Sequence, residues 1–214
     1  PFACNAPFIL DPARVEIKSL ETSPTNRWLL HKVGQLAAES ILAWLNQENL
    51  STRRRCAAYA LLPDVDRDDT SLEGRCGTHV EEAFQERLGG ENYVMSEAGE
   101  LGGEDDCISM PMEIREVWEP NNVTEFFSSD DQYLVSQYIK QGDLLKLINW
   151  NFVNELQPLD IIDVLSTCEV PKPRTWQQLL TLWSYVSSEI VTDSSGDEFL
   201  DLNILPVQGR RTLQ

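Results

Sequence analysis

The sequence has no long apolar run, no closely spaced cysteines and only two histidines, and each absence removes a class of protein. No stretch reaches the ~18 consecutive apolar residues that a membrane span needs, so we expect no membrane partner. His31 and His79 are far apart and no C-x-x-C pair occurs, which leaves no ligand set for a structural zinc ion. The five cysteines are scattered and odd in number, which favours free thiols in a reducing compartment and predicts a cytoplasmic protein.

Motifs of nucleotide and acyl-transfer chemistry are missing as well. The chain contains no G-x-x-x-x-G-K-[ST] loop, no G-x-G-x-x-G turn and no G-x-S-x-G nucleophile elbow. Gly99–Gly103 is rich in glycine, but the carboxylates around it would repel a phosphate. We therefore expect no cofactor, no metal and no catalytic residue set within these 214 residues, and predict that the chain by itself is not an enzyme.

Negative charge is abundant and unevenly placed. The net charge is -18, and the segment 64–131 holds 20 acidic residues against four arginines. Direct nucleic-acid binding is disfavoured, because phosphate affinity comes from clustered Lys and Arg. The segment is either a solvated acidic surface or a docking patch for a basic partner. Two smaller alternatives are weak calcium binding at 104–106 and a phosphate clamp at Arg53–Arg55, which more simply compensates a helix dipole.

The first third of the chain has the pattern of an α/β piece. Residues 2–18 predict strand, turn and strand, since Asp11-Pro12 marks a turn and apolar residues alternate with charged ones after it. Ser23-Pro24 then predicts a helix start, and the helix extends to about Asn49. The apolar run Cys56–Leu62 predicts a second strand, which would make the long helix a crossover connection.

The remainder has a mainly helical pattern. Thr78–Leu88 predicts a helix opened by a capping box. We place the domain boundary at Glu119–Ser129, between an α/β domain at 1–119 and a helical domain at 130–214, and the fold class is mixed α+β. Trp28, Trp44, Trp176 and Trp183 lie on apolar helical stripes, so we expect them in the core. Further helices are expected at 130–140, 143–149, 158–167 and 175–190, and a strand at 199–207.

Glu16-Ile17-Lys18 matches half of a metal-dependent nuclease motif. That chemistry needs a further carboxylate to share the metal, and Asp11, on the predicted turn, is a poor scaffold for it. An exposed alternating strand explains the triplet more simply, and the nuclease is only a third hypothesis.

Two groups of residues resemble sacsin-like proteins and their NO VEIN relatives. The first is Asn5-Ala6-Pro7-Phe8 with Arg14, followed by Asn26-Arg27-Trp28-Leu29-Leu30. The second is the segment Leu179 to Tyr185 followed by Leu205-Pro206-Val207-Gln208-Gly209. These families carry an N-terminal ATPase similar to those of gyrase B, a heat-shock chaperone and histidine kinases. The nucleotide-binding residues of that ATPase have no match in this chain.

The resemblance implies that the chain is a non-catalytic interior region downstream of such an ATPase domain. It would couple nucleotide state to the binding of a client or partner protein, with ATP and Mg²⁺ bound elsewhere in the parent. In related ATPases a region of this kind can supply a basic residue to the γ-phosphate, and Arg14 and Lys18 are the candidates here. The alternative is an acidic interaction module of a multidomain bacterial defence or nucleic-acid-processing protein.

Overall fold

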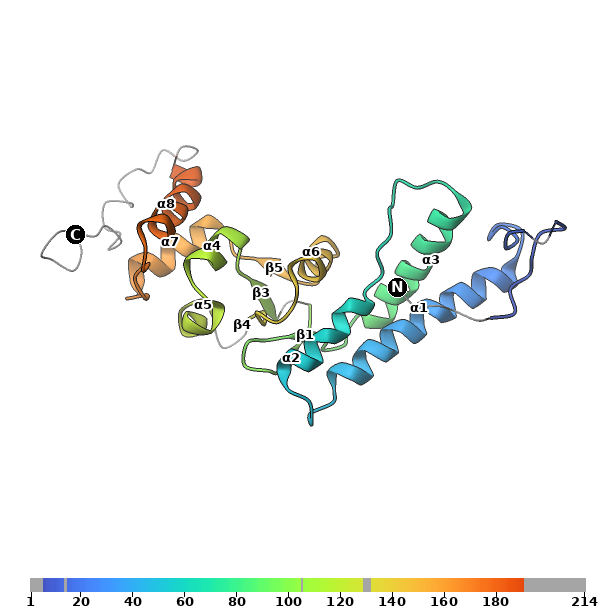
Figure 1. Ribbon diagram of the computed structural model, residues 1–214, viewed down its shortest axis with the longest axis horizontal. Helices are drawn as coiled ribbons and strands as arrows, with labels where there is room; N and C mark the ends of the chain where they lie inside the picture. Colours follow the sequence, from blue (N-terminus) through green and yellow to red (C-terminus); the bar gives the residue numbers. More distant parts are fainter. Residues whose placement is uncertain (1–5, 14, 105, 129–131, 191–214) are drawn as a thin grey trace, which may run out of the picture. The chain divides into compact units, whose positions relative to one another are not determined.

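The computed structural model describes residues 6–13, 15–104, 106–128 and 132–190, and its fold is mixed α+β and mainly helical, as expected (Figure 1). The chain divides into two compact units. Unit 1 comprises residues 1–93 and 138–146, and unit 2 comprises 94–137 and 147–214. The chain therefore passes between the units three times, the last time within one helix, α6 (Gln141–Asn149).

Unit 1 is built around two long helices, α1 (Pro24–Leu45) and α3 (Leu72–Leu88), which lie side by side (Figure 1). The start of α1 is the predicted one: the Ser23 hydroxyl accepts a hydrogen bond from Asn26 N at 3.3 Å, and Pro24 fills the first turn. Gly34 faces α3, where a Cβ atom would lie 2.9 Å from Ala83 Cβ and 3.0 Å from Phe84 N. The absence of a side chain at Gly34 therefore lets the two helices approach closely.

The strand, turn and strand predicted at 2–18 form in part: in the described residues of this stretch, Leu10 and Ile17 make one antiparallel bridge within a short hairpin. The strand predicted at Cys56–Leu62 is wrong, so the described residues around α1 form no crossover unit. Cys56–Leu61 is a 3-10 helix (η1) that follows the short helix α2 (Thr52–Arg55). Three alanines favour a helical backbone there, and only Leu62, placed before Pro63, is extended.

Helix α3 begins six residues before the predicted start at Thr78. Ser71 is its N-cap and accepts a hydrogen bond from Gly74 N at 3.1 Å, while the Thr78 hydroxyl donates to Gly74 O within the helix. Gly74 weakens the helical pattern in the sequence, but a Cβ there would collide with Asp69 in the preceding loop. The loop thus packs onto the first turn of α3, which the sequence pattern does not reveal.

Unit 2 contains two small sheets and several short helices. Strands β1 (Val94–Met95) and β2 (Leu101–Gly102) pair antiparallel, and β3 (Cys107–Ser109) lies between β4 (Tyr133–Leu134) and β5 (Asn154–Glu155) in a parallel sheet. The helical elements are α4 (Met112–Val117), η2 (Pro120–Asn122), α5 (Thr124–Phe127), α7 (Pro158–Thr167) and α8 (Trp176–Ile190).

The helices predicted at 143–149, 158–167 and 175–190 are confirmed within a residue or two, but the one at 130–140 is wrong. Tyr133 N donates to Asp106 O and Val135 N donates to Ile108 O, so this stretch pairs with β3. Tyr and Val favour strands, and the ladder of hydrogen bonds decides their conformation. The strand predicted at 199–207 lies outside the described residues.

One apolar core unites the helices of unit 2. Val117, Trp118 and Phe127 pack in the same cluster as Leu182 and Val186 of α8. The predicted boundary at Glu119–Ser129 therefore falls inside this packing, and the division into two units differs from the predicted domains 1–119 and 130–214. The apolar side chains of α4 and α5 need the cover of α7 and α8, which keeps these segments in one unit.

The tryptophans divide between core and surface. Trp183 packs against the core of unit 2 as expected, but Trp28 is 58% exposed, Trp44 37% and Trp176 65%. The buried face of α1 is instead formed by small and aliphatic residues, including Ala38, because α3 lies close against it. Within the described part of the chain, no helix is both long and apolar enough to cross a bilayer.

We expect N-ethylmaleimide at neutral pH to label Cys168 well before Cys107. Both thiols are free, but Cys168 is exposed, whereas burial and the nearby Asp106 carboxylate raise the pKa of Cys107 to about 12. Because the thiolate is the reactive form, Cys107 stays protected until the fold opens. Peptide mass mapping after timed quenching measures both rates, with Cys168→Ser as the control that removes the fast step. Equal rates at the two thiols would contradict the burial of Cys107.

Candidate binding site

Of the two predicted phosphate-contacting residues, Lys18 belongs to the hairpin before α1. Arg14 lies outside the described residues, and Lys18 is exposed. The Asp11 carboxylate accepts hydrogen bonds from Val15 N and Glu16 N, so it closes the turn between the two strands of the hairpin. The Asp11 carboxylate therefore has a structural role in the turn, and the Glu16 side chain is exposed.

Asn26 fixes this hairpin to the first turn of α1. Its side chain is fully buried, accepts from Ile9 N at 2.7 Å, and donates to Ile9 O at 2.7 Å and to Lys18 O at 2.9 Å. The first residue of the family-like segment Asn26–Leu30 thus holds two distant stretches together. This role was missed in the sequence because it depends on contacts 17 residues apart.

The acidic segment 64–131 contributes to both units, and in unit 1 several of its carboxylates are paired. The buried Glu81 carboxylate accepts from Arg67 at 2.6 Å and from Gln85 at 2.9 Å. Both Asp69 oxygens accept hydrogen bonds from Ser71, and these lower the Asp69 pKa. Further pairs are Glu91 with Arg87, Glu82 with His79, and Asp64 with Lys146.

Neither of the smaller predicted ion sites is assembled in the described residues. One carboxylate oxygen of Asp106 accepts a hydrogen bond from Gly103 N at 2.8 Å, and Asp105 lies outside the described residues. Across residues 6–13, 15–104, 106–128 and 132–190, no group of three His, Cys, Asp or Glu side chains could hold a metal ion. The basic run Arg53–Arg55 ends α2, where Arg55 donates to Leu45 O and so ties the run to α1.

Unit 1 has an open pocket of about 590 Å³, but its charges largely offset one another. Its guanidinium groups belong to Arg27, Arg67 and Arg75. Arg67 is bonded to Glu81, and Arg75 lies 3.8 Å from Glu21. Three carboxylates, of Glu21, Asp69 and Glu82, share the lining, so it offers an anion no net excess of positive charge.

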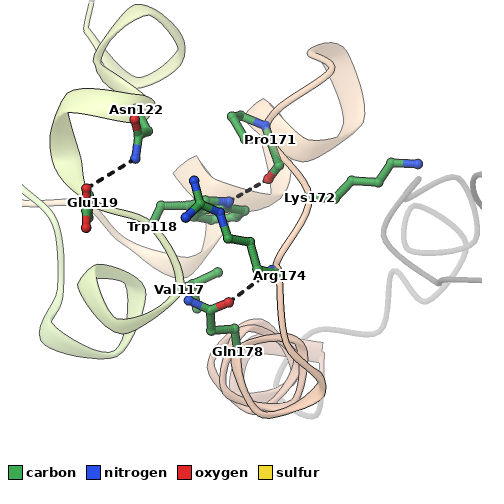
Figure 2. Close-up of a pocket in the computed structure, with 8 residues that line it drawn as sticks. All are labelled: Val117, Trp118, Glu119, Asn122, Pro171, Lys172, Arg174 and Gln178. Carbon is green, nitrogen blue, oxygen red and sulfur yellow. Dashed lines mark hydrogen bonds between the residues drawn. The ribbon is translucent and has the colours of Figure 1, made fainter.

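Unit 2 has a smaller pocket, of about 240 Å³, between the end of α4 and the segment that leads into α8 (Figure 2). Its apolar side is formed by Val117, Trp118 and Pro171, and the Trp118 indole donates to Pro171 O at 2.6 Å. Gln178 fixes the opposite end: its oxygen accepts from Arg174 N at 3.0 Å and its amide donates to Glu116 O at 3.1 Å. The pocket walls are thus held by side-chain hydrogen bonds at both ends.

The charges of this pocket are unusual for so acidic a chain. Lys172 and Arg174 line it with a single carboxylate, that of Glu119. The Arg174 side chain extends toward Trp118, whereas that of Lys172 points away (Figure 2). Within the described part of the chain, the Arg174 guanidinium forms no ion pair with a carboxylate. The arrangement presents one available cation beside an apolar wall.

The sequence contained a signal for this pocket that its composition obscured. In Pro171-Lys172-Pro173-Arg174 two prolines alternate with two cations, in a chain of net charge -18. These prolines separate the helices predicted at 158–167 and 175–190. Proline also fixes its own φ and keeps the preceding residue extended, so this segment has little freedom to lose when a ligand binds.

No family model, no curated protein and no solved structure matched this chain.

Proposed function

We propose that this chain is a non-catalytic interior region of a sacsin-like, chaperone-type ATPase, and that it couples nucleotide state to the binding of a client or partner protein. The proposal rests on the resemblance at Asn26–Leu30 and Leu179–Tyr185. The residues that carry it stabilise their own units: Asn26 joins the hairpin to α1, and Tyr185 donates to Leu156 O at 3.1 Å. Such roles suit a region that transmits a conformational change and performs no chemistry.

The threefold passage of the chain between the units is the structural observation that supports the coupling role in this proposal. The connections follow residues 93, 137 and 146, and the last lies within α6. A helix transmits displacement better than a flexible loop, since its backbone hydrogen bonds fix successive residues. A change at the N-terminal hairpin of unit 1 would therefore act on unit 2 through several covalent connections.

ATP hydrolysis by the full parent protein tests this function. We expect activity in the parent, none in the isolated 214 residues, and a lower kcat in the parent carrying Arg14→Ala or Lys18→Ala. Loss of a charged contact to a transferring phosphate costs ~10²-fold or more, because that contact strengthens in the transition state. Arg53→Ala is the matched control, since Arg53 is an exposed arginine on α2.

Hydrolysis by the isolated chain would overturn the non-catalytic assignment. A parent without ATPase activity would overturn the family assignment. An unchanged kcat in both the Arg14 and the Lys18 variant would remove these residues as phosphate contacts and leave the coupling role to be tested through nucleotide-dependent partner binding.

The loop before α3 favours the second candidate, an acidic module that docks a basic partner. Asp64, Asp66 and Asp68 are exposed there, and the Asp66 carboxylate folds the loop by accepting from Asp68 N at 3.0 Å. Binding of a basic protein such as histone H1 that weakens steeply with salt and ignores nucleotide would support this candidate. Asp68→Asn with Asp64→Asn should then reduce the salt dependence, while Glu125→Gln in unit 2 should not.

A further inference from the structure

The pocket between α4 and α8 has the chemistry of a peptide-binding site. Its volume of about 240 Å³ is below the ~300–1,000 Å³ of pockets that enclose whole small-molecule ligands. One or two side chains fit it better than a nucleotide does. Its apolar lining consists of the exposed Pro171 with Val117 and Trp118, which are 4% and 5% exposed, and the Arg174 side chain extends toward Trp118 (Figure 2). The pocket would therefore receive an apolar side chain, mainly against Pro171, next to an anionic one.

We propose that this pocket binds a short acidic peptide segment of a partner protein, with a Glu or Asp carboxylate paired to Arg174 and a neighbouring apolar side chain against Pro171 and Trp118. The guanidinium fork matches a carboxylate in two parallel hydrogen bonds, which a lysine cannot reproduce. Glu119, on the same lining, suits a peptide N–H donor rather than a second anion.

The pocket is held in shape before any ligand arrives. The Trp118 indole donates a hydrogen bond to the carbonyl of Pro171, and the Gln178 side chain accepts one from the backbone N–H of Arg174. Pro173 precedes Arg174 and restricts the backbone between these two hydrogen bonds. A binding loop that is already ordered loses little conformational freedom on association, so even a small contact can be specific. The proposal goes beyond nucleotide coupling and does not depend on it.

Charge complementarity selects this partner over others. A basic peptide would place its cation beside Arg174 with only Glu119 to compensate, and repulsion would oppose it. A nucleic acid needs a run of cations, whereas the chain carries 17 basic against 35 acidic residues. An acidic segment is the partner that the available cation and the apolar wall can both stabilise.

Titration of ¹⁵N-labelled protein with a defined peptide tests the proposal. The probe is the uncharged-ended peptide acetyl-Gly-Ser-Leu-Glu-Leu-Ser-Gly-amide, and its Glu→Gln analogue is the matched ligand control. We expect saturable shifts of the Trp118 indole N–H and the Gln178 side-chain amide with the Glu peptide, and about 5-fold weaker binding of the Gln peptide. Arg174→Gln should give the same loss, while Arg53→Gln should leave the affinity unchanged.

Three results would overturn the proposal. One is equal affinity for the Glu and Gln peptides, and another is shifts that leave Trp118 and Gln178 unaffected. The third is reproduction of the same shifts by inorganic phosphate at equal concentration, which would indicate a general anion site. Arg174→Lys separates charge from geometry: it keeps the cation, so binding lost in this variant supports bidentate recognition and full binding contradicts it.

Discussion

Replacement of Gly34 by alanine should destabilise unit 1 by roughly 2 kcal/mol or more, a typical cost of overpacking a core. A Cβ at this position would collide with Val80 O and would lie 2.9 Å from Ala83 Cβ and 3.0 Å from Phe84 N. Two of these neighbours are backbone atoms of α3, so no side-chain rotation relieves the contact. The helices must separate, which also loosens the buried residues around Ile41.

Whether Gly34→Ala lowers or raises the stability shows whether packing or helix propensity dominates at this position. Alanine is a better helix former than glycine by ~1 kcal/mol, so the exposed part of a helix should gain stability from the same change. Gly142 in α6 provides that control, because nothing lies within 4 Å of its Cβ position. We expect Gly142→Ala to stabilise by about 0.5–1 kcal/mol.

Hydrogen exchange measures the Gly34→Ala effect locally, because the chain has two units and a single unfolding curve would mix them. Amides of α1 and α3 should lose protection in Gly34→Ala, while those of α7 and α8 should keep it. Unchanged or increased protection in α1 and α3 would contradict the close approach of the two helices.

Replacement of Asn26 by aspartate should free the hairpin from α1 and cost roughly 1–3 kcal/mol, the penalty of a buried polar group that loses its partner. Aspartate is nearly the same shape and still accepts from Ile9 N, but it cannot donate to Ile9 O or Lys18 O. The change also buries a carboxylate at a position with no exposed surface.

Exchange at the Ile9 and Lys18 amides reports this change, since both amides donate hydrogen bonds in the hairpin region. Asn26→Ala should behave like Asn26→Asp, and Asn46→Ala is the control. The Asn46 side-chain amide donates to Leu42 O at 2.8 Å from an exposed position at the end of α1, so its loss should cost under ~1 kcal/mol. Equal effects of the Asn26 and Asn46 variants would show that Asn26 does not hold the hairpin.

Local signals predicted some elements well and failed at others for a physical reason. Ser23-Pro24 fixes the start of α1 through contacts within one turn, and the periodicity of 158–167 and 175–190 is long enough to define α7 and α8. The strands β3, β4 and β5 are two or three residues long and are held together by the pairing of Ile108 with Leu134 and Asn154. No periodic pattern develops over so short a length, so only the distant partners reveal them.

Local sequence offered a proline-rich cationic segment for the pocket between α4 and α8, but not the contacts that form its walls. Trp118 and Pro171 are 53 residues apart, and Gln178 and Glu116 are 62 apart, so their hydrogen bonds appear only in the folded chain. The net charge predicted a docking patch among the carboxylates of 64–131, whereas the proposed peptide site depends on a cation, Arg174. The family-like residues were identified in the sequence, but the structural role of Asn26 required the three contacts that it makes.

The return of residues 138–146 to unit 1 has a consequence during synthesis. On the ribosome, unit 1 cannot be completed when residue 93 emerges, because Ile139 and Leu144, both buried, have not yet been made. At ~5–20 residues per second, the nascent chain waits about 3–10 s for them. During that interval the apolar surface that they cover stays open to nascent-chain chaperones, and the first part of unit 2, residues 94–137, is synthesised before unit 1 is complete.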